Sequence, residues 1–548
     1  MKQIIYLFLL ARLCSQQVEF IPFDWGGQFG YVNKNGAIMW NEDWQSNRLL
    51  FDGTWAIYPK MYGHEIEDAF LNQTPDTSSF DSSRVTSYFK YDQGDYLLDR
   101  FSFGSNYTGD GRQVHLHGFK RSFAGGIFNQ YDNDFHQPIQ QTYTASYESK
   151  KGQDHAGISF GHFNTFSGIA DSTTRGLLDN RITIANTFWD RSFGVFNSKI
   201  SIDQFLQRFQ ANHSLSEFTG VRYLTRSRIM GELGWTGPDG TTFHFGTEFN
   251  QRNTRIDSLK NVNWSKFYLK GDWSDLHGMM GLVISKDEMT PEIELNYFKN
   301  FERYFVSFEY DKNVKPTHVY ESQIKLTRKI LTQKTTITGE LGWKSRKNKI
   351  SFIGSHFNFY NYMENIYTPF LSGIPPSDLI EYLHSNYGFN YQTTSIPFLD
   401  VNFTYSNQKT DNVLSDGIAD KFNLNTKTHF SLFDGFMLVD VSLSLNGWLN
   451  REWSASMHPI EMIPVSNYSG WEMWPVPDST EELDDVWFVN GSITAYVSTF
   501  TIKYEWFNIS EMILASIGSD QDNFFEIHPE IPRLGRQVNL SLEWHFMD

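Results

Sequence analysis

Two histidines and a group of aspartates are the residues whose types and spacing come closest to a metal site. His115 and His117 are separated by one residue, and on a strand that spacing places both imidazoles on one face, as a metal pair requires. Asp92, Asp95 and Asp99 resemble a loose calcium loop without its partner glutamate. Histidines spaced in this way are more common on the wall or rim of a large sheet. We therefore expect no metal site and no cofactor.

Motifs for catalysis are missing from the sequence. It contains no Gly-x-Ser-x-Gly turn, phosphate-binding Gly-rich loop, dinucleotide fingerprint or His-Glu-x-x-His. No nucleophile, base and orienting group form a recognisable set. We expect the protein not to be an enzyme.

The composition favours one large β-sheet with an apolar and a polar face. Aromatic residues make up 17% of the 548 residues, yet only 40% are hydrophobic and the mean hydropathy is −0.44. A disordered chain cannot bury so much ring surface. A single cysteine excludes a disulfide scaffold. No internal stretch approaches the roughly 20 apolar residues of a membrane-spanning helix, so a helical membrane bundle is also excluded.

The chain is acidic, with a formal charge of −17. Nucleic acid is a poor partner for such a chain because phosphates require basic patches. Acidic loops on a solvated surface explain the charge more simply.

The N-terminus predicts a secretory signal peptide at residues 1–15. Lys2 precedes a short apolar run, Ile4 to Ala11, that is too short to cross a bilayer. Cleavage after Ser15 would leave a mature chain without cysteine, which suits an oxidising compartment. Lipidation at Cys14 remains a less favoured alternative, because Leu13 stands where a small residue is expected.

Period-two alternation of apolar and polar residues dominates the chain from about residue 84 to 546 and predicts strands. The clearest segments are 242–250, 265–273, 292–297, 304–310, 335–343, 401–406, 437–445 and 538–546. Helical spacing is rare, although 203–209 and 377–384 each allow a helical turn. Residues 237–240 and 311–313 are turn-like.

The two faces of these strands favour a membrane barrel over a soluble sandwich. One face carries Phe, Tyr, Trp, Leu and Gly, and the other carries polar side chains, as a lipid-facing exterior around a wet lumen requires. Aromatic rings stand at strand ends, which is typical of membrane interfaces: Trp235, Trp273, Trp343 and Trp506. A series of sandwiches would need linkers, and none interrupts the alternation. We predict an all-β fold, a single large transmembrane antiparallel up-and-down β-barrel of about 22 strands (range about 16 to 24).

Connection lengths support the same fold. Long connectors are expected at 59–83, 164–180, 360–383, 408–420, 449–485 and 508–534, with tight turns between them. Outer-membrane barrels have long external loops and short periplasmic turns. The loop at 449–485 is rich in aromatic and acidic residues, so we name Trp453, Trp471 and Trp474 as candidates for binding a ligand.

The last strand has the form of an assembly signal for barrel insertion. Its apolar alternates are Val538, Leu540, Leu542, Trp544 and Phe546, and only two residues follow. Such signals usually end on the aromatic residue itself, so the two extra residues are a departure. The barrel-assembly machinery and outer-membrane lipid are accordingly expected partners.

Three short segments in the C-terminal part of the chain carry a resemblance to a known family. Pro532 to Arg536 is a proline and Gly-Arg segment directly before the last strand, Glu505 to Asn508 ends a strand on Asn, and Lys315-Pro316 leads into Tyr320. Together these segments resemble TonB-dependent receptors. The resemblance implies a receptor-like barrel of about 22 strands.

The resemblance fails at the N-terminus. Residues 16–83 are too few for the plug of that family, and 28–58 already have strand character. We therefore expect 16–548 to form the barrel, with long extracellular loops and no separate plug domain. Partial occlusion of the lumen is expected from loops, with 449–485 and 59–83 as candidates.

The function expected from these features is an outer-membrane transport pore or receptor-like channel for small solutes, in a Gram-negative type of envelope. The alternatives are a ligand-binding component of a TonB-type uptake system gated by a plug or lipoprotein partner and, as the least favoured, an outer-membrane enzyme. The candidates for lining the lumen are His244, Glu248, Lys270, Asp272, Glu292, Glu294, Lys503 and Glu505.

Overall fold

The fold was analysed in a computed structural model of the chain. The structure describes residues 83–122, 139–168, 176–213, 220–255, 259–286, 288–316, 331–363, 379–410, 417–453, 481–510, 516 and 534–547, and short strands at 18–68, 456–457 and 464–465. The signal peptide expected at 1–15 lies outside these ranges and stays a prediction. Among the described residues, no helix has the length and apolar character needed to cross a membrane.

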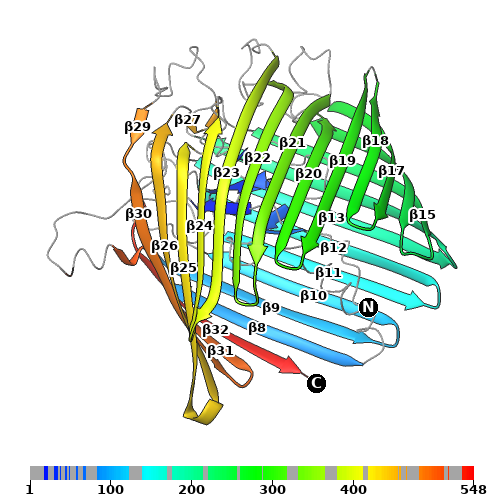
Figure 1. Cartoon of the computed structure of the whole chain (residues 1–548). Helices are drawn as coiled ribbons and strands as arrows, with labels where there is room; N and C mark the ends of the chain where they lie inside the picture. Colours follow the sequence, from blue (N-terminus) through cyan, green and yellow to red (C-terminus); the bar gives the residue numbers. More distant parts are fainter. Residues whose placement is uncertain are drawn as a thin grey trace.

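One antiparallel barrel contains 22 long strands, and the predicted fold class is confirmed. Each strand pairs with the next along the chain, and β32 pairs with β8 to close the barrel (Figure 1). The barrel strands are β8 (Arg84–Gly94), β9 (Leu98–Gly109), β10 (Arg112–Ser122), β11 (Ile139–Lys151), β12 (Asp154–Gly168), β13 (Gly176–Phe193), β14 (Phe196–His213), β15 (Gly220–Thr236), β16 (Thr242–Arg255), β17 (Leu259–Trp273), β18 (Leu276–Ser285), β19 (Glu288–Phe301), β20 (Tyr304–Pro316), β21 (Leu331–Lys344), β22 (Asn348–Met363), β23 (Leu379–Ile396), β24 (Leu399–Thr410), β25 (Ile418–Leu432), β26 (Met437–Trp453), β30 (Val486–Val497), β31 (Phe500–Phe507) and β32 (Gln537–Met547).

Short elements complete the described chain. β29 (Glu481–Leu483) pairs with the end of β26 and continues the line of β30. A 3₁₀ turn, η5 (Phe433–Gly435), joins β25 to β26. β27 (Ser456–Met457) and β28 (Pro464–Val465) pair with each other between β26 and β29.

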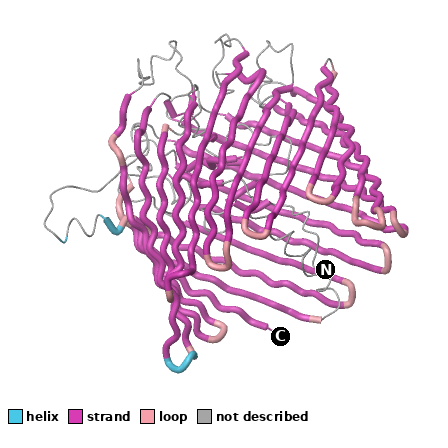
Figure 2. The backbone as a smooth tube through the Cα atoms, viewed as in Figure 1, coloured by secondary structure: helices cyan, strands magenta, loops and turns pink. Residues whose placement is uncertain are grey.

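The two ends of the barrel differ in their connections. At one end, called here the tight-turn end, connections range from two residues, Asp110–Gly111, to five, Gly237–Thr241 (Figure 2). At the opposite end, called the loop end, several consecutive strands are connected by long segments, such as 454–480 and 508–536. The connections 95–97 and 286–287 at this end are short. The expected asymmetry is thus present, and the tight-turn end corresponds to the periplasmic side of such barrels.

The outward face is apolar beside the tight-turn end. On β16, Phe243, Phe245 and Phe249 are all exposed, as lipid-facing residues are. The predicted interface residues Trp235, Trp273 and Trp343 end their strands at this side, and exposed Phe196, Tyr304 and Phe398 extend the row. Trp506 lies at the loop end of β31. The tryptophans therefore mark both edges of the wall, as expected for girdles.

Aromatic rings lie directly over glycines of the adjacent strand. A Cβ atom at Gly246 would lie 2.1 Å from the Tyr268 ring, and a Cβ atom at Gly342 would lie 2.1 Å from Phe305. In each case the register places the ring directly opposite the glycine. The same arrangement recurs at Tyr88/Gly104, Phe103/Gly118, Phe188/Gly157 and Trp487/Gly447. Such pairs fix the register of neighbouring strands, and the ring shields the backbone of the glycine from solvent.

The N-terminal strands do not belong to the barrel sheet. β1 (Val18–Pro22), β2 (Gly30–Lys34), β3 (Ala37–Ile38), β4 (Trp44–Gln45) and β5 (Arg48–Leu49) form a separate sheet, and β6 (Ile57–Pro59) pairs with β7 (Ile66–Asp68). They lie within the outline of the barrel in Figure 1. The strand character expected at 28–58 is present, but the barrel begins at Arg84 rather than near residue 16. The absence of a plug domain stays a prediction.

The observed secondary structure differs from the sequence-based expectation at three places. Residues 311–313, expected to turn, lie inside β20, and 203–209, expected to allow a helical turn, fall in β14. Of 377–384, the other such segment, the described residues 379–384 fall in β23. Asp311 and Asn313 alternate with Lys312, so they point to one face, where Asp311 is opposite Glu294 of β19. A wet lumen accepts polar residues that would end a strand in a soluble sheet.

We predict that Gly342→Ala destabilises the barrel by about 1–3 kcal/mol, because the added methyl group must displace the buried Phe305 ring. Gly339→Ala on the same strand is the control, since a Cβ atom there meets nothing within 4 Å. The measurement is the denaturant midpoint in detergent. Equal midpoints for the two variants would contradict the role of the ring.

Candidate functional site

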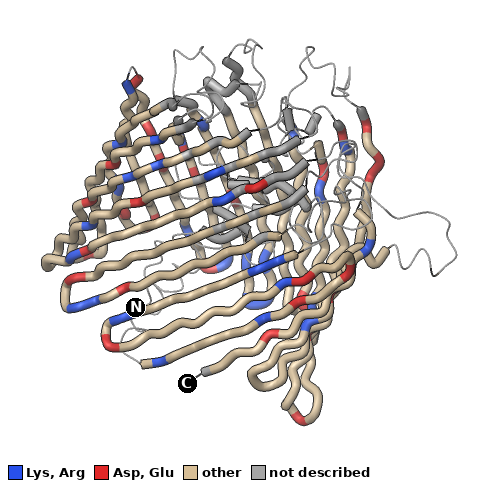
Figure 3. Tube along the Cα trace, turned by 180° about the vertical axis from the view of Figure 1, so that it is seen from behind, with Lys and Arg blue, Asp and Glu red and all other residues tan. Residues whose placement is uncertain are grey.

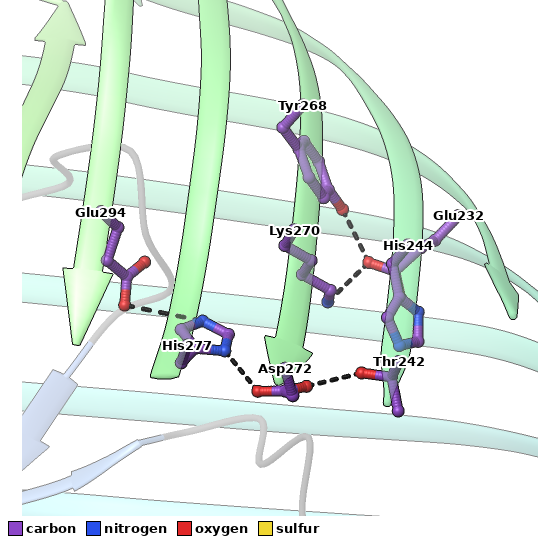
Figure 4. A network of polar contacts seen from close by, with 8 residues as sticks. All are labelled: Glu232, Thr242, His244, Tyr268, Lys270, Asp272, His277 and Glu294. Carbon is purple, nitrogen blue, oxygen red and sulfur yellow. Dashed lines mark hydrogen bonds and ion pairs between the residues drawn. The ribbon is translucent and has the colours of Figure 1, made fainter. Parts of the chain in front are cut away.

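A network of polar side chains lies on the inner face of β15 to β17, near the tight-turn end (Figure 4). Its centre is Glu232, whose carboxylate accepts a hydrogen bond from the Tyr268 hydroxyl at 3.0 Å and lies 2.7 Å from the Lys270 ammonium. Nδ1 of His244 lies 3.0 Å from the other carboxylate oxygen. These groups alternate with the exposed apolar residues of the same strands, so they belong to the lumen face.

A second group continues the network across β16 to β19. Asp272 accepts a hydrogen bond from the Thr242 hydroxyl at 2.7 Å and lies 2.5 Å from Nδ1 of His277. Nε2 of His277 is 3.9 Å from Glu294, which also accepts a bond from Asn296 at 2.8 Å (Figure 4). About half of the Asp272 side chain is exposed. The network therefore ends in groups that a solute in the lumen can reach.

The structure brings together half of the predicted lumen residues and places the others nearby or elsewhere. His244, Lys270, Asp272 and Glu294 join the network above. Glu292 is nearly buried and pairs with Lys266 at 2.6 Å, and Glu248 is opposite that lysine in the register of β16 and β17.

Lys503 and Glu505 pair with each other at 2.5 Å on β31, a strand next to the closing strand β32. They lie on a different part of the wall from β15 to β19. The predicted pair is therefore not part of the network, and its role in lining the lumen stays a prediction.

Sequence reasoning missed Glu232, Tyr268 and His277. Glu232 stands in a strand with Gly231 and Gly234, whose pattern is weak because glycine has no side chain. Tyr268 lies in the alternating segment 265–273, whose pattern alone gives it no role. The signal that finds all three is register. Gly246 of β16 is opposite Glu232 on one side and Tyr268 on the other, and Asp272 is opposite His277.

The charges of the lumen wall are paired locally rather than sorted by sign. Figure 3 shows lysine and arginine interspersed with aspartate and glutamate along the strands. Lys90 lies 3.6 Å from Glu543, and Lys349 lies 3.9 Å from Glu340. Paired charges cancel within a few ångströms, so the wall offers many polar contacts without one dominant sign.

The lumen face changes character towards the loop end. Large inward side chains in the middle and loop-side part of the strands are almost inaccessible, and Phe205 and Arg121 are 0% exposed. In an empty barrel of this width they would be exposed to water. We call these residues the buried belt: Phe119, Arg121, Ile184, Phe205, Arg226, Arg252, Trp264, Val283, Phe357 and Trp448. The belt residues lie on strands from β10 to β26, and their side chains are shielded from water.

The metal-like groups of the sequence have other partners. Within the described ranges, no three His, Cys, Asp or Glu side chains are close enough to hold a metal ion. His117 lies 2.5 Å from the Tyr88 hydroxyl, and His115 contacts Asn106. Asp92 is buried beside Arg100 of β9, at 3.5 Å.

Asp95 caps the barrel closure, because one carboxylate oxygen accepts the backbone N–H of Val538 at 2.9 Å. The assembly-signal strand is present as β32, with Leu540, Leu542 and Trp544 exposed on the lipid face. Val538 and Phe546 share that face by alternation.

The ligand-loop candidates are only partly placed. Trp453 is the last residue of β26 and is opposite Glu481. Trp471 and Trp474 lie outside the described residues, so their role stays a prediction.

Comparison with known proteins shows the fold. No family model and no curated protein matches the chain. Among solved structures, it is similar to the FrpB iron transporter from Neisseria meningitidis (TM-score 0.68, 7% identity, 98% of this chain and 96% of that one). It is also similar to the ferripyoverdine receptor of Pseudomonas aeruginosa (TM-score 0.62, 10%, 97% and 83%) and to the siderophore receptor PirA of the same organism (TM-score 0.57, 9%, 85% and 81%).

We predict that Glu232→Gln lowers the free energy of unfolding by about 1.5–3 kcal/mol, because Lys270 and the Tyr268 hydroxyl lose a charged partner. Glu294→Gln is the control, since its side chain is one-third exposed and its contact with His277 is long. That substitution should change stability by less than about 1 kcal/mol. The measurement is again the denaturant midpoint, and a larger effect of Glu294→Gln would contradict the central role of Glu232.

Proposed function

We propose that the protein is an outer-membrane, receptor-like channel for small solutes that is closed in the loop-side part of its lumen. The observation that carries this proposal is the buried belt in a closed barrel of 22 strands. A barrel with fewer strands already holds a water-filled channel, so one this wide would leak unless it were filled. The accessible charges lie on the tight-turn side of the belt, where they would meet a solute after the closure had opened.

The lumen chemistry favours a polar permeant with several hydrogen-bonding groups. Alternating ion pairs, such as Lys270 with Glu232 and Lys266 with Glu292, offer donors and acceptors in turn. A permeant bound to such a wall exchanges partners without being held by one strong charge. The structural neighbours include an iron transporter and a siderophore receptor, so ferric chelates are the first class to test.

The closing element that we favour is the N-terminal segment that precedes Arg84. Its strands pair with one another and lie within the outline of the barrel in Figure 1. The aromatic loop between β26 and β29 is the other candidate. A second function follows from a removable closing element: a ligand-binding receptor that depends on a partner for the energy of opening.

We predict that the full chain carries almost no steady current in planar bilayers, because the belt is covered. Deletion of residues 16–82 should give long-lived open channels with a conductance at least tenfold larger. Deletion of 454–480 tests the other candidate, and deletion of 317–330 is the control for shortening the loop end. Folding of each variant is checked by its heat-dependent shift in electrophoretic mobility.

Each outcome decides one part of the proposal. Steady current from the full chain would contradict a closed channel. A channel that opens only when 454–480 is deleted would assign the closure to that loop instead of the N-terminal segment. Binding of a ferric chelate by the full chain without current would favour the receptor that needs a partner.

A further inference from the structure

A cluster of cations occupies two adjacent turns at the tight-turn end. Arg303 lies in the β19–β20 turn, and Lys344, Arg346 and Lys347 lie at the β21–β22 turn (Figure 1). The turns are in contact, because the backbone N–H of Lys344 donates to the carbonyl of Arg303 at 2.7 Å. We call these four residues the basic rim patch. They gather positive charge in a chain whose net charge is −17.

The basic rim patch differs from several paired cations of the same end in having no ion-pair partner among the described residues. Among the described residues, no carboxylate lies within 4.0 Å of any of its four cationic groups. Elsewhere at this end Lys299 pairs with Asp275, Arg191 with Asp154 at 3.6 Å and Lys427 with Asp440 at 2.7 Å. Glu302 in the β19–β20 turn is the nearest acid in sequence, and it leaves a clear local excess of positive charge.

The surroundings of the patch are those of a lipid interface. Tyr304 and Trp343 are opposite each other at the ends of β20 and β21, and Tyr304 is 59% exposed. On the other side, the β23–β24 turn presents Phe398, which is 74% exposed. Near that turn, the backbone N–H of Thr394 in β23 donates to the carbonyl of Lys347 at 2.9 Å. Apolar rings and cations therefore stand side by side at the edge of the lipid-facing wall.

We propose that the basic rim patch binds the head groups of anionic phospholipids in the periplasmic leaflet. Aromatic residues at the edge of a barrel lie at the depth of the head groups, and cations beside them reach the phosphates. An acidic protein segment has the same charge, but the continuity of the patch with the lipid-facing wall favours lipid. This assignment is independent of what the channel transports.

The attraction is local. Screening limits each charge to about 8–10 Å at physiological salt, so acidic loops at the far end of the barrel do not cancel the patch. Each cation near an anionic surface strengthens binding about fivefold. Removing two should therefore weaken binding about 25-fold.

The test is lipid retention by the purified full chain, measured by native mass spectrometry from detergent containing dioleoylphosphatidylglycerol or dioleoylphosphatidylcholine. We expect the wild-type chain to retain the anionic lipid selectively. The double variant Arg346→Gln/Lys347→Gln should lose about 25-fold in apparent affinity. The control Arg191→Gln/Lys427→Gln removes the same charge from two cations of the tight-turn end that pair with Asp154 and Asp440, and it should change the affinity by less than about threefold.

Other outcomes would overturn the assignment. Equal retention of both lipids by the wild-type chain would contradict the proposed lipid site. An equal loss of affinity in the two double variants would contradict it as well. Displacement of the lipid by millimolar inorganic phosphate alone would assign the patch to free anions. Binding of polyglutamate in preference to dioleoylphosphatidylglycerol would assign it to an acidic protein.

Discussion

Every strand of the barrel crosses a medium that offers the backbone no hydrogen-bond partner, so the sheet has to close on itself. Closure is made by β32 and β8, which pair from Asn539 and Gly94 to Met547 and Thr86. This pairing joins residues from opposite ends of the described chain. The closure determines which residues form the wall of the barrel, because every residue before Arg84 lies outside the barrel sheet. The separate N-terminal sheet is a consequence of this closure.

The pairs of glycine and aromatic residues explain how so wide a sheet keeps its register. A barrel made of alternating residues has few local features that distinguish one pairing from the next shifted by two residues. A ring that fits only over a glycine supplies that distinction, and it does so at intervals around the wall. The pair of Gly246 and Tyr268 has a second effect, because the ring above the glycine carries the hydroxyl that binds Glu232. The polar network therefore depends on a residue without a side chain.

The strands and their faces could be predicted from the sequence because period-two alternation is a local property. Segments such as 242–250 and 538–546 fall within β16 and β32 for that reason. The errors at 203–209 and 311–313 arose where inward polar residues, such as Asp203 and Asp311, resembled helix or turn signals. Contacts between strands, such as that of Glu232 with Lys270, depend on the register of strand pairing. The residue pattern of a single strand does not give that register. Burial of Phe205 and Arg121 depends on what fills the lumen, which strand patterns do not reveal.

The two halves of the lumen have opposite physical requirements, and this opposition favours a gated channel over an open pore. A covered surface can hold a large apolar side chain such as Trp264. It can also hold Arg226, because the guanidinium carbon lies 4.8 Å from the centre of the Trp264 ring and this cation–π contact strengthens where water is excluded. An open surface has to stay solvated, so its charges are better paired and partly exposed, as at Lys270, Asp272 and His277. If the whole lumen were open, the belt would place rings and aliphatic side chains in water at a large hydrophobic cost. If the whole lumen were filled, the exposed groups of the network would lose hydration without new partners. The observed division is stable only with a closure on the loop side and water on the other.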